Sequence, residues 1–335
     1  MGAILVTGGA GFVGLNIVEA LLARGEHVIV FGREKALPVA AEQVFRHLPG
    51  QLEVLAGDVC DRAALRRIFT TRSIDRLFPF AAITAGPGRE ATQASAVIET
   101  NLLGLIATLE AARDAGGLRR VVLPASGAVY GESAYTHSLL DEAGTPCVPI
   151  SLYGTTKYAV ERAGLRLCAL WGLDAVVARI GATFGPWERD TGVRDTLSPH
   201  LSIARHALAG EEAVLPPSPP PAYDWVYVRD LAMGLLTLLD AKAPAERVFN
   251  IASGQDWSPH IDACCETLAA AMPGFRWRHA TAGERPSVTF SETKPRGVMA
   301  IGRAAGLGWR PQYSAVGAYD DYAAWLLRVG RDGLG

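Results

Sequence analysis

The sequence lacks a large excess of charge of either sign. Its 32 lysines and arginines nearly balance 34 aspartates and glutamates, which gives a formal net charge of -2. Such a chain lacks the basic surface that attracts nucleic acid or an anionic membrane. It also lacks an apolar run as long as a membrane span, and no basic segment precedes the first apolar run as in a secretory signal. We therefore expect a small-molecule substrate, and no nucleic-acid or membrane partner.

The sequence is also poor in patterns that bind metal or form a disulfide framework. Its five cysteines are scattered, and Cys264 and Cys265 are adjacent, which is not the C-x-x-C spacing. The seven histidines do not cluster with them at ligand spacing. We expect reduced thiols, no metal site and a cytoplasmic protein.

The most informative stretch of the chain is its first apolar run and the turn that follows. Ile4–Val6 is predicted to be a buried parallel strand, and a helical pattern follows up to about Gly25. Gly8, Gly11 and Gly14 stand between them. Glycines permit positive φ and close backbone approach, so the free amides at the helix start can bind a pyrophosphate. The alternative is an ordinary tight turn between a strand and a helix.

Strands and helices alternate through the first half of the chain. This alternation predicts an α/β protein with a doubly wound parallel sheet, in which ligands bind at the carboxyl ends of the strands. The expected strands after the first cover 27–31, 52–55, 76–82, 119–124 and 175–180, and the expected long helices cover 91–115 and 151–171.

The composition changes after Gly181. Residues 216–221 are rich in proline and are predicted to be extended and not helical. A helix is expected to end near Asp240, a strand at 248–252 to rejoin the sheet, and two more helices to cover about 260–271 and 315–329. We therefore expect a dinucleotide-binding domain of residues 1–180 plus 222–252, and a smaller substrate-binding lobe of residues 181–221 plus 253–335.

A second informative stretch contains Tyr153 and Lys157. Four residues apart on a helix, they share one face. A phenol with its ordinary pKa near 10 is a poor base at neutral pH, and a neighbouring ammonium favours the phenolate. Ser126 follows an expected strand, where its hydroxyl can hold a substrate oxygen. The alternatives are a surface Tyr–Lys pair and a turn serine that bonds its own backbone.

With these segments in view, the chain resembles the extended short-chain dehydrogenase/reductase family, the NAD-dependent epimerase/dehydratase group. The resemblance covers most of the chain. It rests on Thr7–Gly14, Gly57-Asp58-Val59, Ala81-Ala82, Asn101–Gly104, Ser126 with Val129-Tyr130-Gly131, Tyr153 with Lys157, Arg179 with Phe184-Gly185-Pro186, and Asp224–Val228 with Asp230-Leu231.

The resemblance implies a Rossmann fold and a role for each matching residue. Tyr153 would be the general acid/base, and Lys157 would lower its pKa and hold the nicotinamide ribose. Ser126 would orient the reacting hydroxyl, and Asn101 would support the active site. The cofactor contacts would be Gly8, Gly11, Phe12, Val13, Gly14, Asp58, Val59, Ala81 and Ala82, together with Tyr153 and Lys157.

One departure from the family concerns the cofactor. NAD-binding members usually carry an acid at the position of Gly32, where it holds the ribose hydroxyls. Without that carboxylate a 2′-phosphate is not repelled, and Arg33 can contact one. These two residues, added to the cofactor set, favour NADP over NAD. The alternative is that Arg33 stacks on the adenine and NAD still binds.

Other departures concern the substrate. Tyr223 stands where nucleotide-sugar enzymes of the group usually have an arginine, Ala182 where they have asparagine, and Pro79 where histidine is common. Missing donors for a diphosphate favour a smaller hydroxylated substrate. The candidate substrate contacts are Thr84, Ser126, Thr183, Arg189, Arg194, Arg229 and Arg285. The alternative for each of these arginines is a role in a surface salt bridge. The alternative for Thr84 is that it only closes a turn.

Together these observations predict an NAD(P)-dependent oxidoreductase that transfers hydride at a secondary alcohol or ketone of a small sugar, sugar acid or hydroxy acid. The alternative is a nucleotide-sugar epimerase or dehydratase with tightly bound NAD. A non-catalytic dinucleotide sensor is disfavoured by the complete Ser–Tyr–Lys set. Apolar residues of 91–115 and 151–171 predict a homodimer, unless they are buried within one chain. The lobe that selects the substrate matches no motif.

Overall fold

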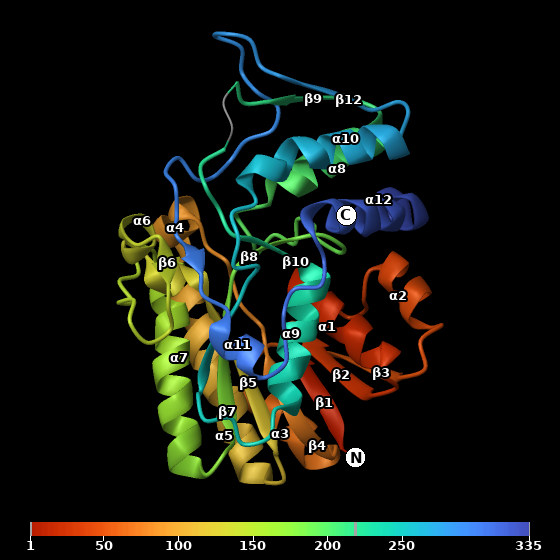
Figure 1. Cartoon of the computed structure of the whole chain (residues 1–335). Coiled ribbons are helices and arrows are strands. Elements are labelled where there is room, and N and C mark those ends of the chain that lie inside the picture. The colour runs from red at the N-terminus through yellow and green to blue at the C-terminus, as the bar shows by residue number, and fades with distance from the viewer. Residues whose placement is uncertain (1, 218–219, 335) are drawn as a thin grey trace.

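The centre of the structure, a computed structural model that describes residues 2–217 and 220–334, is a seven-stranded parallel sheet (Figure 1). The strand order β11-β7-β5-β4-β1-β2-β3 reverses direction between β1 and β4, as in a doubly wound sheet. The α/β class predicted from the alternation is confirmed. The strands are β1 (Ala3–Thr7), β2 (His27–Gly32), β3 (Gln51–Ala56), β4 (Ile74–Pro79), β5 (Arg120–Ser126), β7 (Ala175–Ile180) and β11 (Val248–Ile251).

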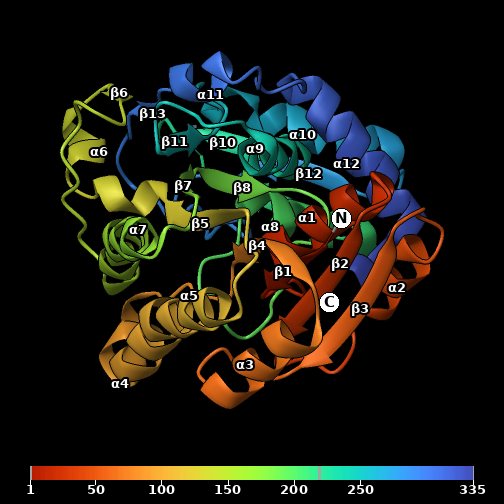
Figure 2. The ribbon, with the colours of Figure 1, turned by 90° about the horizontal axis from the view of Figure 1, so that it is seen from below.

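Helices cover both faces of this sheet, which explains its continuous apolar strands. Ile4, Leu5 and Val6 of β1 are all fully buried, because side chains on both faces meet a helix layer. In Figure 2 the two layers lie on either side of the sheet. One layer contains α3 (Arg62–Thr71), α5 (Gly104–Ala115) and α7 (Leu152–Trp171); the other contains α1 (Phe12–Ala23) and α9 (Val228–Asp240), with the short α2 (Val39–Phe45) beside it.

The expected helix 91–115 is interrupted. It consists of α4 (Pro87–Ile98), a π-helical turn η1 (Glu99–Leu103) and α5. The whole stretch Pro87–Ala115 has the length and mean hydropathy of a membrane span, but 44% of its most apolar window is buried. Val97 and Leu109 are fully buried in the protein core. We read this stretch as a covering helix of the sheet.

The C-terminal part of the chain forms a layer over the carboxyl ends of the strands (Figure 1). In it β9 (Glu212–Leu215) pairs with β12 (Arg276–His279). Two helices, α8 (Pro199–Ala209) and α12 (Ala315–Val329), both pack on α10 (Ile261–Ala271). Two further pairs tie this part to the first half. They are β8 (Ala182–Phe184) with β10 (Trp225–Tyr227), and β6 (Leu139–Leu140) with β13 (Val298–Met299). The remaining short elements are η2 (Gly127–Tyr130), α6 (Ser133–Thr136), η3 (Ser258–His260), α11 (Gly302–Gly306) and η4 (Gly330–Gly333).

Most long elements lie where the sequence places them, and the short ones differ. The strand expected at 76–82 ends at Pro79, so residues 80–82 form a loop at the carboxyl edge. Helices α2, α3 and α8 were not predicted. In the proline-rich stretch no described residue is helical, while residues 218–219 lie outside the described part. The division into a domain of 1–180 plus 222–252 and a lobe of 181–221 plus 253–335 stays a proposal.

Candidate active site

A cavity of about 580 Å³ opens at the carboxyl edge of the sheet and continues beneath the C-terminal layer. Its volume is in the range of ligand-binding sites. All the predicted cofactor contacts line it, and so do four of the predicted substrate contacts. These lining residues are Gly8, Gly11, Phe12, Val13, Gly14, Gly32, Arg33, Asp58, Val59, Ala81, Ala82, Tyr153 and Lys157, with Thr84, Ser126, Thr183 and Arg194.

The glycine turn has the geometry that a pyrophosphate needs. Gly8 has φ of +67°, and a Cβ on Gly14 would lie 2.3 Å from the carbonyl oxygen of Gly8. Only glycine allows this closeness of α1 to the turn. Gly11 precedes α1, no side chain caps the helix, and no acid stands in its first turn. The free amides at this end therefore face the cavity, so the residues present fit a dinucleotide.

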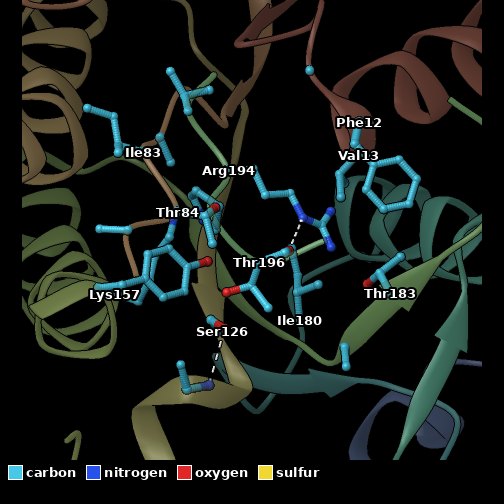
Figure 3. Close-up of a pocket in the computed structure, with 18 of the residues that line it drawn as sticks. Phe12, Val13, Ile83, Thr84, Ser126, Lys157, Ile180, Thr183, Arg194 and Thr196 are labelled. Carbon is cyan, nitrogen blue, oxygen red and sulfur yellow. Dashed lines mark hydrogen bonds between the residues drawn. The ribbon is translucent and has the colours of Figure 1, made fainter. Parts of the chain in front are cut away.

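Ser126, Tyr153 and Lys157 come from the end of β5 and the start of α7. Ser151 caps α7 by accepting a hydrogen bond from the Gly154 amide, which fixes where the helix begins. The ammonium of Lys157 lies 5.7 Å from the ring centre of Tyr153. Ser126 Oγ accepts a hydrogen bond from the Ala128 amide at 3.2 Å, so the turn-serine contact exists alongside exposure to the cavity. Figure 3 shows Ser126, Lys157 and Thr84 around one space.

The electrostatics of this group differ from the expectation. Burial raises the pKa of Tyr153, and the smaller opposing effects of Ser126, Arg194 and Thr84 do not reverse it. Burial also lowers the pKa of Lys157 to about 8. The predicted lowering of the phenol pKa by Lys157 is therefore absent from the protein without ligands. Lys157 is almost fully buried, and none of the described residues accepts a hydrogen bond from its ammonium, which leaves that group free for ligand hydroxyls.

Asn101 supports the site without lining it. It lies in the π-helical turn η1, where its Oδ1 accepts from the Ile83 amide at 2.7 Å. Its Nδ2 donates to the Ile83 carbonyl and to Thr156 Oγ1 at 3.0 and 3.1 Å. Asn101 therefore holds the loop after β4 against α7. Its contact on α7, Thr156, lies between Tyr153 and Lys157 in the sequence. We describe it as a positioning residue.

The adenosine end of the cavity contains a residue that the sequence analysis missed. A Cβ on Gly32 would lie 3.1 Å from Glu34 Oε2. The Glu34 carboxylate thus occupies the space of the acid that Gly32 lacks, and it lines the cavity beside Arg33. The sequence signal was the acid two residues beyond the strand end, but its return toward Gly32 depends on the turn after β2.

Three of the predicted anion contacts lie outside the cavity. Arg229 pairs with Asp321 at 3.1 Å, and Arg285 is exposed between β12 and β13. Arg189 Nη2 donates to the Ala10 carbonyl at 2.6 Å, behind the glycine turn. The positions of Arg229 and Arg285 match the salt-bridge and surface alternatives. Arg189 matches neither, because it is half-buried and its Nη1 is buried without a hydrogen-bond partner among the described residues.

Arg296, by contrast, lines the cavity and was not predicted. Its guanidinium lies 5.3 Å from the ring centre of Tyr223 and 5.5 Å from that of Tyr135, and Nη1 lies 3.0 Å from Glu292 Oε1. Arg296, from the segment before β13, thus brings a guanidinium next to Tyr223, the residue that stands where an arginine was expected from the family resemblance. No motif marked it, because it is 73 residues away from Tyr223 and its position depends on β13 pairing with β6.

Comparison with known families places this geometry in context. The sequence pattern of the NAD dependent epimerase/dehydratase family matches residues 4–252. The chain is 26% identical to dTDP-glucose 4,6-dehydratase 1 of Escherichia coli, over 97% of this chain and 92% of that protein. It is 27% identical to UDP-glucose 4-epimerase of Halalkalibacterium halodurans, over 96% and 94%.

Solved structures of epimerases are similar to this chain over nearly its whole length. The UDP-glucose 4-epimerase of Thermus thermophilus in complex with NAD superposes with a TM-score of 0.76 at 25% identity, covering 97% of this chain and 99% of that one. The enzyme of Bifidobacterium longum in complex with NAD+ and UDP has a TM-score of 0.78 at 21% identity, which supports the fold.

Proposed function

Because the chain belongs to the NAD-dependent epimerase/dehydratase family, we propose that it oxidises a secondary hydroxyl of a nucleotide-linked sugar and then reduces the same carbon, with net epimerisation. The observation that carries this proposal is the single cavity shared by the glycine turn, Ser126, Tyr153 and Lys157. The relatives named above act on nucleotide sugars, which favours this substrate class over the free sugars or hydroxy acids suggested by the sequence departures.

Each residue of the group has a defined task. When bound, NAD would supply the hydride acceptor and return the hydride. Tyr153 takes the hydroxyl proton on oxidation and gives it back on reduction, and Ser126 holds the same oxygen. Lys157, whose pKa is about 8, presents its ammonium to the hydroxyls of the nicotinamide ribose.

We propose NAD as the cofactor, in place of the NADP that Gly32 and Arg33 favoured. The support is the Glu34 carboxylate beside Gly32, which can accept hydrogen bonds from the ribose hydroxyls and repels a 2′-phosphate. A relative of known structure binds NAD as well.

A second candidate is the net dehydrogenation of a smaller hydroxylated substrate. Arg296, which lines the cavity beneath the C-terminal layer, is paired with Glu292 at 3.0 Å. An arginine that donates hydrogen bonds, next to a carboxylate that accepts them, can bind sugar hydroxyls as well as a diphosphate. This candidate differs from the first in releasing reduced cofactor.

Incubation with the nucleotide sugars UDP-glucose, UDP-glucuronate and dTDP-glucose and, in parallel, with free sugars and sugar acids separates the two candidates. We expect an epimeric nucleotide sugar by chromatography and no accumulation of reduced nicotinamide by absorbance. Tyr153→Phe should abolish turnover and leave NAD binding intact, because it removes only the hydroxyl. Accumulation of reduced cofactor with a free sugar or sugar acid, and none of the epimer, would favour the dehydrogenase. Near-normal turnover of Tyr153→Phe would exclude both.

A further inference from the structure

Residues 186–198, here called the strap, cross the cavity from α1 to the loop after β4. At one end the Asn16 amide group donates to the Pro186 carbonyl at 2.8 Å, and Trp187 Nε1 donates to Glu19 at 2.6 Å. At the other end the Thr84 amide donates to the Val193 carbonyl at 2.8 Å. The strap thus joins the two sides of the carboxyl edge, and five of its members line the cavity: Thr191, Val193, Arg194, Thr196 and Leu197.

The second end is held by an ion pair as well. Arg89 contacts Asp195 through Nε and Nη2 at 2.8 to 3.0 Å, and the Gly86 amide donates to the same carboxylate at 2.9 Å. Arg89 also donates to the Gly192 carbonyl. These bonds hold the backbone of the strap beside Thr84 and thereby fix the position of the Arg194 backbone.

Arg194 carries its guanidinium from the strap to the glycine turn. The guanidinium carbon lies 5.0 Å from the ring centre of Phe12, the first residue of α1. In Figure 3 the side chain extends across the cavity from the strap toward Phe12 and Val13. The cation therefore lies beside the first residue of α1, the helix whose free amides fit a pyrophosphate.

The orientation of Arg194 is fixed by two partners. Nε donates to the Thr196 carbonyl at 2.9 Å, and Nη2 lies 3.1 Å from Glu188 Oε1. Glu188 is fully buried and also accepts hydrogen bonds from the Ser198 amide and hydroxyl. Within residues 2–217 and 220–334 no partner is recorded for Nη1. One edge of the guanidinium is thus held and the other is available to a ligand.

We propose that Arg194 binds the pyrophosphate of the dinucleotide, so that the cofactor is held between the α1 amides and a cation of the strap. The inference rests on the dinucleotide binding proposed above and adds a contact from outside the nucleotide-binding half. A guanidinium presents two N–H groups to phosphate oxygens and keeps its charge at every relevant pH. Pyrophosphate binding would explain why an arginine of the strap lies beside Phe12 at the start of α1.

The test is calorimetric titration of the full chain, freed of bound nucleotide, with ADP-ribose and with adenosine. ADP-ribose contains the pyrophosphate and adenosine does not. Arg194→Gln should weaken ADP-ribose binding about tenfold or more, the usual worth of a charge-assisted hydrogen bond. It should leave adenosine binding within about twofold. Arg285→Gln, which removes an exposed arginine outside the cavity, is the matched control and should change neither.

Because Arg194→Gln leaves Glu188 without its cation, each variant is checked by thermal unfolding, and Arg194→Lys serves if the first fails to fold. Lysine keeps the charge without the planar fork, so we expect about a fivefold loss for ADP-ribose alone. Unchanged ADP-ribose affinity in the folded variant, or an equal loss for adenosine, would overturn the proposal. If the wild-type protein binds neither NAD nor ADP-ribose, the proposed function itself fails.

Discussion

At the scale of the residue, Lys157 is the clearest case of a side chain kept in a costly state. Its ammonium is buried next to a phenol, and no carboxylate among the described residues pairs with it. Burial disfavours the charged form, so its pKa falls to about 8. A group held this way lowers the stability of the empty protein and is available to a ligand.

This cost predicts a pH dependence. Between pH 8 and 10.5 the unfolded chain binds more protons at Lys157 than the folded one, so the free energy of unfolding rises with pH across that window. Below pH 8 the penalty is fully present, at about 3 kcal/mol from the size of the shift. Lys157→Met should therefore stabilise the nucleotide-free protein at pH 7.

Urea unfolding of wild type and Lys157→Met at pH 7 and pH 10 measures this effect. We expect the gap between the two proteins to shrink at the higher pH, because other groups titrate equally in both. A gap of the same size at both pH values would show that the effect comes from packing and not from the buried charge.

Glu34 gives a second prediction at this scale, on the cofactor. Glu34→Gln should weaken NAD binding roughly fivefold, since the carboxylate is exposed and its hydrogen bonds compete with water. The same change should strengthen NADP binding, because it removes the repulsion of the 2′-phosphate. Arg33→Gln is the neighbouring control and should lower affinity for NADP more than for NAD. Tighter NADP than NAD binding by the wild-type protein would reject the role of Glu34.

At the scale of the element, the π-helical turn η1 connects the helix layer to the site. Such turns are frequent at functional sites, and the buried residue of this one is Asn101. Asn101→Ala would leave the Ile83 amide and carbonyl without partners, which costs about 2–4 kcal/mol of unfolding free energy. Thr156→Val leaves both Ile83 bonds in place. It removes the bond from Asn101 and the one that Thr156 Oγ1 donates to the Tyr153 carbonyl at 2.8 Å, and should cost about 2 kcal/mol.

Kinetics distinguish positioning from simple stability. In Asn101→Ala we expect kcat to fall by more than tenfold with KM changed little, because the loop after β4 and the start of α7 lose their registration. The activity of Thr156→Val, measured at a temperature where both variants are folded, should stay near wild type. Equal and small losses in both variants would mean that Asn101 only stabilises the fold.

The elements that sequence predicted and those it missed differ in kind. Strands such as β7 and long helices such as α12 are marked by a continuous apolar run or a long period, and the structure has them at the expected bounds. The loop after β4 and the π-helical turn η1 are joined by tertiary hydrogen bonds, above all those of Asn101 to Ile83. Propensity carries no signal for such bonds.

At the scale of the whole molecule, the same contrast separates the two halves of the site. The glycine turn, Ser126 and the Tyr153–Lys157 pair are local patterns, so the sequence places them in one cavity. Arg296 and the strap reach the cavity through contacts between segments more than 70 residues apart in sequence. Their roles follow only from the tertiary structure, and the cytoplasmic location inferred from the cysteines stays a prediction.

The predicted homodimer is also a matter of the whole molecule. Among the apolar residues of 91–115 and 151–171, Val97, Leu105, Leu109 and Val160 are buried within the chain, as the alternative to a dimer requires. Leu170 is 59% exposed, and Leu103 in η1 is 49% exposed. We therefore predict that the dimer contact includes these two leucines of the helix layer formed by α4, α5 and α7, because exposed apolar side chains gain from being covered.

The prediction is that wild type has twice the mass of one chain by light scattering, and that Leu103→Arg with Leu170→Arg gives a folded monomer. The new charges would face their own copies across a two-fold interface, where like charges repel and the apolar burial is lost. Leu327→Arg, an equally exposed position on α12, should leave the dimer intact. A monomeric wild type would exclude the interface, and dissociation by Leu327→Arg alone would move it to the C-terminal layer.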